Sequence, residues 1–222
     1  LDKESTIAYY KNTGTASLPE FTYIDYNLFN LDQENFGLRS IPTFGDMDGD
    51  GDLDLFTGGL EKSDCKHCMV TGIIWNDGRG NFSKHNTTHL PQHGEVYFNV
   101  PEASMGDIDG DGDLDIVLSR AGHLYGGTAV SIIENLGNKK FKSHGIIEVL
   151  PAPDGYVATS EANPWNKFII SIKFRDLDKD GDMDIFLHSL APRTNGSVLL
   201  NKGNLKFEVL MPHQTKHLIS KK

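Results

Sequence analysis

Hydrophobic and polar positions along the chain form short apolar or alternating runs that end in glycine-containing polar turns, a pattern typical of β-strands. Such runs precede and follow three Asp-rich stretches, at residues 39–44 and 53–57, 102–105 and 114–119, and 168–174 and 183–188. A further apolar run leads into an Asn-Gly turn, and a last strand is expected to begin at Phe82, Phe141 or Phe207. No stretch has a convincing helical period. The sequence therefore predicts an all-β protein with four antiparallel strands per unit.

The same unit recurs along the chain. The Asp-rich stretches begin at residues 46, 107 and 176, which are 61 and 69 residues apart. The turn motif follows each of them, as IIWNDGRGNF, IIENLGNKKF and VLLNKGNLKF, and a fourth copy surrounds Asn12 without an Asp-rich stretch before it. We expect one region over residues 1–222, with repeats at approximately 1–38 (partial), 39–98, 99–166 and 167–222.

Four-stranded units of this length are typical of β-propeller blades, in which neighbouring blades bury each other's faces. The chain holds three full units and the back half of another, and it leaves no spare first strand for ring closure. We therefore expect part of a larger propeller, or a product completed by another chain or a missing segment. A small closed four-bladed ring remains the alternative.

Composition places the acidity of the chain in the Asp-rich stretches. The chain has 222 residues, 38% of them hydrophobic, and a formal net charge of −10. The three stretches contain 15 of the 31 acidic residues and one of the 21 basic residues. Neither a nucleic-acid-binding surface nor a membrane span is predicted, because 20 basic and 16 acidic residues lie outside the stretches and no apolar run is long enough. There is no initiator Met and no signal peptide, so we interpret the sequence as a mature, trimmed or excised product.

Each stretch carries five aspartates at alternate positions, which would repel one another unless a cation lay among them. A hard divalent cation with oxygen ligands, most plausibly calcium, fits this chemistry. Three calcium sites are therefore predicted, with these residues as ligands: Asp46, Asp48, Asp50, Asp52, Asp54, Asp107, Asp109, Asp111, Asp113, Asp115, Asp176, Asp178, Asp180, Asp182 and Asp184.

Positions within the stretch have different expected roles. Side chains at positions 1, 3 and 5 point inward, glycine at position 6 permits a sharp turn, and position 7 offers its carbonyl while its side chain faces outward. An EF-hand would need Glu at position 12 and flanking helices, but that position holds Thr57, Leu118 and Leu187. Asp at position 9 supplies the missing ligand instead. We expect the bound calcium to stiffen a β-hairpin.

The combination of Gly-Asp-x-Asp-x-Asp-Gly-Asp-x-Asp with the following Asn-x-Gly turn and Phe resembles the FG-GAP/VCBS repeat family, found in integrin α-subunit propellers and many bacterial secreted proteins. Gly45-Asp46 and Gly106-Asp107 fit the start of the motif, whereas Arg175 replaces the glycine in the third copy. The resemblance implies a propeller with calcium between the first and second strands of each blade and a ligand on the opposite face.

Loops on that opposite face carry the recognition candidates His67, His89, His93, Tyr97, His123, Tyr125, Tyr156 and Trp165. Any one of them can equally be a packing or solvated loop residue. Cys65 and Cys68 are compatible with a short-loop disulfide, a zinc site with His67, or a redox pair. Possible glycosylation sites are Asn81, Asn86 and Asn195.

No catalytic constellation is present in the sequence, so the chain is not expected to be an enzyme, although it can be part of one. The leading hypothesis is a secreted or cell-surface calcium-binding propeller module for adhesion or protein interaction. Alternatives are a carbohydrate-binding, lectin-like module, including a non-catalytic part of a polysaccharide-active enzyme, and a structural subunit of a surface or filament assembly.

Overall fold

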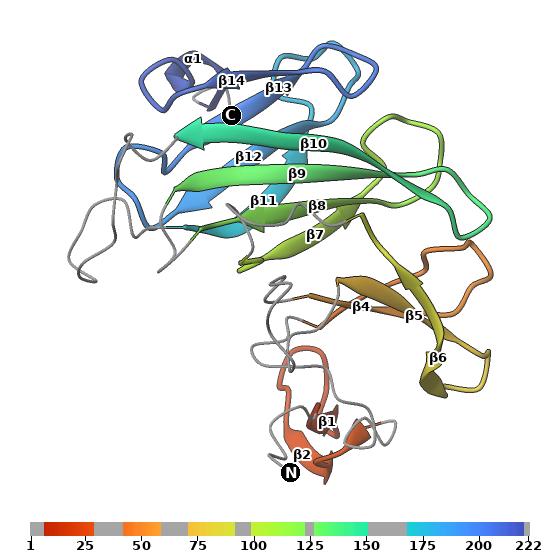
Figure 1. The fold of residues 1–222 in the computed structure, drawn as a ribbon. Helices are drawn as coiled ribbons and strands as arrows, with labels where there is room; N and C mark the ends of the chain where they lie inside the picture. Colours follow the sequence, from red (N-terminus) through yellow and green to blue (C-terminus); the bar gives the residue numbers. More distant parts are fainter. Residues whose placement is uncertain are drawn as a thin grey trace.

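The computed structural model describes residues 7–28, 42–58, 71–91, 99–122, 127–150 and 168–219 as three four-stranded antiparallel sheets and one two-stranded sheet (Figure 1). The N-terminal sheet pairs β1 (Tyr9–Asn12) with β2 (Phe21–Asp25). Sheet 1 contains β3 (Thr43–Gly45), β4 (Asp54–Thr57), β5 (Gly72–Asn76) and β6 (Phe82–His89). Sheet 2 contains β7 (Ala103–Gly106), β8 (Asp115–Arg120), β9 (Thr128–Asn135) and β10 (Phe141–Leu150). Sheet 3 contains β11 (Ile169–Arg175), β12 (Asp184–Ser189), β13 (Ser197–Asn201) and β14 (Phe207–Leu210).

The all-β prediction is confirmed, and the strands lie where the apolar runs predict them. In each four-stranded sheet the strands follow one another in chain order, and the Asp-rich stretch joins the first strand to the second. The three stretches and the three Asn-Gly turns lie at the same end of the sheets, on the right in Figure 1. The described sheets do not form a closed ring, and the repeat boundaries stay a prediction.

One helix was not predicted. A single turn, α1 (Lys216–Ile219), follows the last strand and is too short to produce a periodic pattern. Its Leu218 packs on an apolar face of sheet 3 that includes Val198, Leu200 and Leu210. The C-terminal segment therefore covers the face of sheet 3 that points away from sheet 2.

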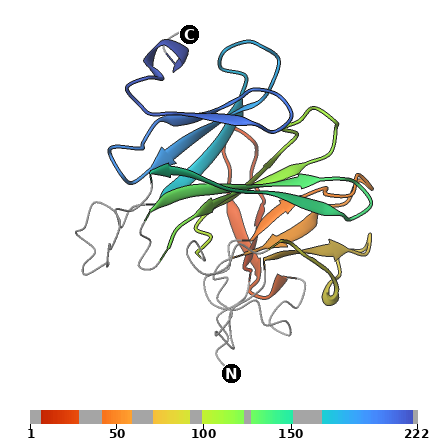
Figure 2. The same ribbon diagram turned by 45° about the horizontal axis from the view of Figure 1, so that its top comes forward.

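Sheet 2 is buried between its two neighbours because its strands are apolar on both faces (Figure 2). Ile116, Leu118 and Ile133 pack with Phe56 and Trp75 of sheet 1. The intervening side chains Val117, Val130 and Ile132 pack with Ile185, Leu187 and Leu199 of sheet 3. Because side chains alternate between the two faces of a strand, successive residues in the strands of sheet 2 pack in two different cores.

Glycine before the Asp-rich stretch is needed for close packing of neighbouring first strands. A Cβ at Gly45 would lie 2.7 Å from the Met105 sulfur, and a Cβ at Gly106 would lie 2.7 Å from the Phe174 ring. Arg175 stands at the same place in sheet 3 and is exposed. Because no further first strand packs there within the described residues, the arginine is accommodated.

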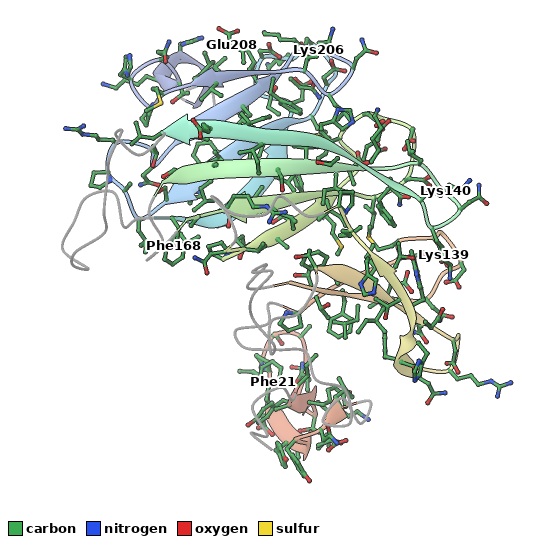
Figure 3. All side chains as sticks on the ribbon, viewed as in Figure 1. Phe21, Lys139, Lys140, Phe168, Lys206 and Glu208 are labelled. Carbon is green, nitrogen blue, oxygen red and sulfur yellow. The ribbon has the colours of Figure 1, made fainter. Side chains whose placement is uncertain are left out.

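The N-terminal sheet corresponds to the third and fourth strands of the other sheets. Asn12 pairs with Phe21, as Asn76 pairs with Phe82 in sheet 1. The Asn12 side-chain oxygen accepts hydrogen bonds from the backbone N–H groups of Gly14 and Glu20, at 3.0 and 3.1 Å. β1 and most of β2 are exposed, and Figure 3 shows Phe21 at this end of the molecule.

Candidate metal sites

Each Asp-rich stretch is a tight loop organised around its first aspartate. In the first loop, Asp46 accepts hydrogen bonds from the N–H groups of Gly49 and Gly51, at 2.9 and 3.1 Å. The second and third loops repeat both bonds at Asp107 and Asp176. The glycine at position 6 has φ values of 96°, 98° and 101° in the three loops, a conformation that favours glycine.

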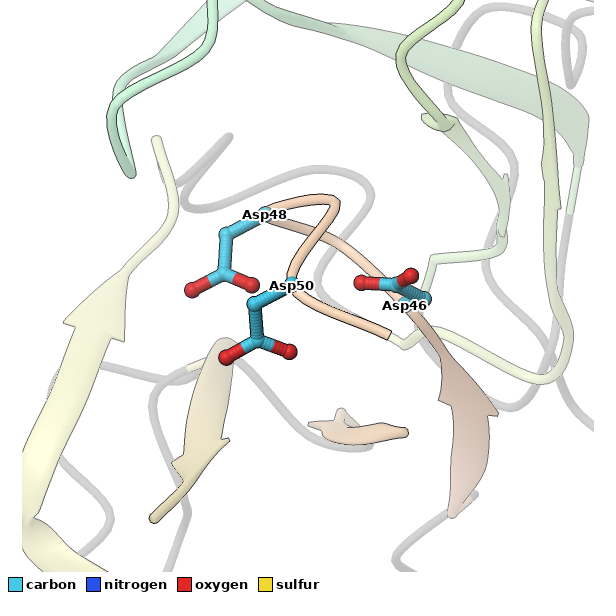
Figure 4. A group of neighbouring side chains, drawn as sticks. All are labelled: Asp46, Asp48 and Asp50. Carbon is cyan, nitrogen blue, oxygen red and sulfur yellow. The ribbon is translucent and has the colours of Figure 1, made fainter. Parts of the chain in front are cut away.

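Carboxylates converge inside each loop. Three groups have ligand oxygens that all lie within 4.8 Å of one another: Asp46, Asp48 and Asp50; Asp107, Asp109 and Asp115; Asp176, Asp178 and Asp184. Figure 4 shows the first group, with the carboxylates of Asp48 and Asp50 side by side. Each group has the geometry to hold a metal ion, and all its side-chain donors are hard oxygens of the kind that calcium prefers.

The aspartate at position 9 connects the loop to the rest of its sheet. Asp115 is fully buried, and its Oδ2 accepts a hydrogen bond from the N–H of Ile108 while its Oδ1 accepts one from the N–H of Asn135. Asp54 and Asp184 make the same two bonds in their own sheets, at 2.7–3.0 Å. A carboxylate oxygen with one N–H donor retains a second lone pair, so these residues can also ligate an ion.

The Asn of the turn motif joins neighbouring sheets, a role that the sequence analysis did not assign. Asn135 of sheet 2 donates from Nδ2 to the Met47 carbonyl in the first loop, at 2.8 Å. Asn201 of sheet 3 donates in the same way to the Ile108 carbonyl in the second loop, at 3.2 Å. Each of these loops is therefore held by its own sheet and by the next one along the chain. The recurrence of the motif was visible in the sequence, but the partner residue was not.

Two observations test whether the loops suit a cation. Oδ1 of Asp48 and Oδ1 of Asp178 are buried and have no hydrogen-bond partner among the described residues. A buried carboxylate oxygen without a donor is costly, and a bound cation would remove that cost. The residues present therefore fit a calcium ion, held by side chains at positions 1, 3 and 5 in the first loop and at positions 1, 3 and 9 in the second and third loops.

The aspartates at position 7 differ from the others. Asp52, Asp113 and Asp182 are half-buried and belong to none of the three carboxylate groups. A carboxylate oxygen of Asp52 lies 3.2 Å from the position of a Cβ at Gly78, and Asp113 has the same relation to Gly137 at 3.3 Å. The side chain at position 7, which is expected to face outward, thus lies over the glycine of the Asn-Gly turn in the same sheet.

Comparison with protein families found a match over residues 107–187 to the FG-GAP-like repeat. This part of the chain is similar to that repeat. The FG-GAP-like region begins at the first aspartate of the second loop and includes the whole third loop. The first loop lies outside the matched residues, but it has the same hydrogen bonds at positions 1 and 9. Comparisons with curated proteins and with solved structures found no match.

Most other predicted site residues lie outside the described residues: Cys65, His67, Cys68, His93, Tyr97, His123, Tyr125, Tyr156 and Trp165. His89 is exposed at the end of β6. The three possible glycosylation residues are exposed, and the amides of Asn81 and Asn86 donate to Asp77 and to the Trp75 carbonyl. No helix of the described residues is long and apolar enough to cross a membrane.

The metal-free protein should lose stability as the pH rises. Burial raises the pKa of Asp115 from 3.8 to about 6, and it also raises the pKa values of Asp54 and Asp184. A carboxyl group whose pKa is higher in the folded state binds more protons when folded, so folding is favoured at low pH. Between about pH 4 and pH 7 we expect the titration of Asp115 alone to lower the free energy of unfolding in EDTA by about 2 kcal/mol. Urea denaturation at several pH values measures this, and an Asp115→Asn variant should show a weaker dependence. A stability that increases over this interval would contradict the prediction.

Proposed function

We propose that this chain is a non-enzymatic calcium-binding module built from propeller-type sheets, which acts outside the cell or at the cell surface in adhesion or another protein interaction. The observation that carries the proposal is the threefold recurrence of one site. In every loop a first aspartate is held by two loop amides, and a buried ninth aspartate is bonded to the next strand. Calcium, when bound, supplies the positive charge that the clustered carboxylates lack.

The proposed propeller architecture is supported by the way the sheets meet. β7 lies against both β3 and β11, so the first strands of the three sheets are neighbours. Adjacent sheets face each other across shared apolar cores, as propeller blades do. Leu218 of α1 packs on the outer face of sheet 3.

A protein is the partner that the described surface favours. The N-terminal sheet exposes large apolar side chains, including Tyr10, Phe21 and Tyr26 at 55%, 67% and 60%. Large apolar side chains exposed together on one small sheet commonly mark a contact with another protein. The sheet also has only two strands where the others have four. Another chain or a further segment that supplied two strands would complete it.

A calcium titration of paired variants tests the proposal. Asp109 belongs to the second carboxylate group, whereas Asp113 lies over Gly137. We expect three calcium ions per wild-type chain by calorimetry, loss of one in Asp109→Ala, and three in Asp113→Ala. The two variants have the same formal charge, so a difference between them reports ligation.

Absence of calcium binding to the wild-type chain would refute the proposed function. Equal stoichiometry in the two variants would refute the assignment of positions 3 and 7. Thermal melting of both variants in EDTA controls for folding without the ion.

A further inference from the structure

The three loops share their aspartates but differ in the cations that the chain itself places beside them. Lys139, in the turn between β9 and β10 of sheet 2, reaches the first loop of sheet 1, where its Nζ lies 3.0 Å from Oδ2 of Asp48. The same ammonium lies 4.2 Å from the centre of the Trp75 ring, which is almost fully buried. Figure 3 shows Lys139 beside the first loop and Lys140 extending away from it.

This ion pair is more confined than a typical surface pair. The Asp48 side chain is 14% exposed and the Lys139 side chain 43%. The Trp75 ring supports the ammonium from one side, and an aromatic ring attracts a cation over its face. The Asn135 bond to the Met47 carbonyl holds the same turn against the same loop. Lys139 is therefore fixed next to the carboxylates that a metal ion would use.

The second loop has a different neighbour at the equivalent place. The turn of sheet 3 has the same shape, since Asn204 and Leu205 have φ values of 54° and 53° where Asn138 and Lys139 have 52° and 60°. Leu205 stands where Lys139 stands in sheet 2, and it is buried in the core between sheets 2 and 3. In the described part of the chain, no Lys or Arg pairs with an aspartate of the second loop.

Two further residues extend the difference. Glu134 occupies in sheet 2 the place of Trp75 in sheet 1, and its charge acts on Asp109 of the second loop. Lys142 and His144 lie 2.8 and 2.7 Å from Oε2 of Glu134, so part of that charge is compensated. The third loop has two cations of its own, because Lys202 of its sheet lies 3.7 Å from Oδ2 of Asp178 and the exposed Lys179 is part of the loop. The local charge is thus more negative at the second loop than at the first.

We propose that Lys139 is a built-in competitor for the cation of the first loop, so that the first loop binds calcium more weakly than the second and is filled after it. This inference rests on the proposed calcium binding. A unit positive charge this close to a divalent ion, in a partly buried place, lowers the affinity of the ion through Coulomb repulsion. In the metal-free state the same charge reduces repulsion among the aspartates and keeps sheets 1 and 2 together.

Terbium luminescence reports the first loop selectively. Tb³⁺ binds oxygen ligands as calcium does and emits when a nearby tryptophan is excited, and Trp75 lies beside the first loop. Trp165 is the other tryptophan of the chain, so all titrations use a Trp165→Phe background. We expect emission in this background to appear only after the first equivalents of Tb³⁺ have bound elsewhere. In Asp109→Ala, which loses a ligand of the second loop, emission should begin earlier.

Substitution of the lysine tests the cause. Lys139→Met should increase the affinity of the emitting site by about tenfold, because it removes the repelling charge. Lys139→Arg keeps the charge and should leave the affinity near that of the parent. Lys140→Met is the matched control, since it makes the same change in net charge at the next, exposed residue. Melting curves in saturating calcium verify that each variant is folded.

Each outcome decides the inference. Two results would overturn the inference: emission from the first equivalent of Tb³⁺, or a Lys139→Met affinity equal to or lower than that of Lys140→Met. If calorimetry still showed three bound calcium ions, the proposed function would stand without it. If the parent bound no calcium, both this inference and the proposed function would be refuted. Delayed emission whose affinity is increased by Lys139→Met, but not by Lys139→Arg or Lys140→Met, supports it.

Discussion

Calcium should raise the melting temperature of this protein by at least about 10 °C relative to EDTA. An ion that binds only the folded state at about a thousand times its dissociation constant stabilises by about 4 kcal/mol per site. For a chain of this size, 1 kcal/mol corresponds to about 2–4 °C in Tm. The effect is expected to be large because the buried ninth aspartates and the partnerless Oδ1 atoms of Asp48 and Asp178 are costly without a cation.

Differential scanning calorimetry at neutral pH measures this shift. Magnesium at the same ionic strength is the control for screening, and it should stabilise less, because Mg²⁺ loses its water reluctantly and needs a more rigid octahedral site. The triple variant Asp46→Asn, Asp107→Asn and Asp176→Asn should lose most of the calcium response. An unchanged Tm after calcium addition would contradict a structural role for the ion.

Asn135→Ala should destabilise the protein by about 3 kcal/mol even when calcium is saturating. The Asn135 side chain donates to the carbonyls of Met47 and Leu114 and accepts from the N–H of Gly137, at 2.8, 3.3 and 3.1 Å. It is fully buried, so its removal leaves the Met47 carbonyl of the neighbouring sheet without that donor in a site closed to water. The cost of an unsatisfied buried group is larger than the net value of a hydrogen bond.

Asn76→Ala is the matched control for this prediction. Asn76 makes the corresponding bonds within its own sheet, to the Leu53 carbonyl and from the N–H groups of Gly78 and Gly80. It is only half-buried and makes no bond to another sheet among the described residues. We expect a cost of about 1 kcal/mol, measured by urea denaturation in calcium. Equal losses in the two variants would show that the bond between sheets adds nothing.

The strands and the loops could be predicted from the sequence because both depend on local patterns. Alternating and apolar runs placed the strands on either side of each Asp-rich stretch, as in β7 and β8 of sheet 2. The glycine at position 6 predicted the sharp turn, and its φ values agree. The ninth aspartate stays a predicted ligand, and its two bonds to backbone N–H groups could not be predicted because they depend on the register of three strands.

The position of the N-terminal strands was also visible in the sequence. The motif around Asn12 lacks a preceding Asp-rich stretch, and β1 and β2 form a sheet of two strands where the others have four. The helix α1 was missed, because a single turn carries no periodicity and its apolar contact through Leu218 exists only once sheet 3 is folded. Arg175 appeared as a departure from the motif, and its place beyond the last packed strand explains it.

By itself, the sequence determined the strands, the three acidic loops and the family resemblance, since each follows from residues close together in the chain. Tertiary structure decided how the loops differ from one another. Asn135 meets Met47 across 88 positions of sequence, and Asn201 meets Ile108 across 93. Lys139 lies beside Asp48 only because sheet 2 packs on sheet 1. Contacts of this kind depend on the packing of whole sheets, which no local pattern contains.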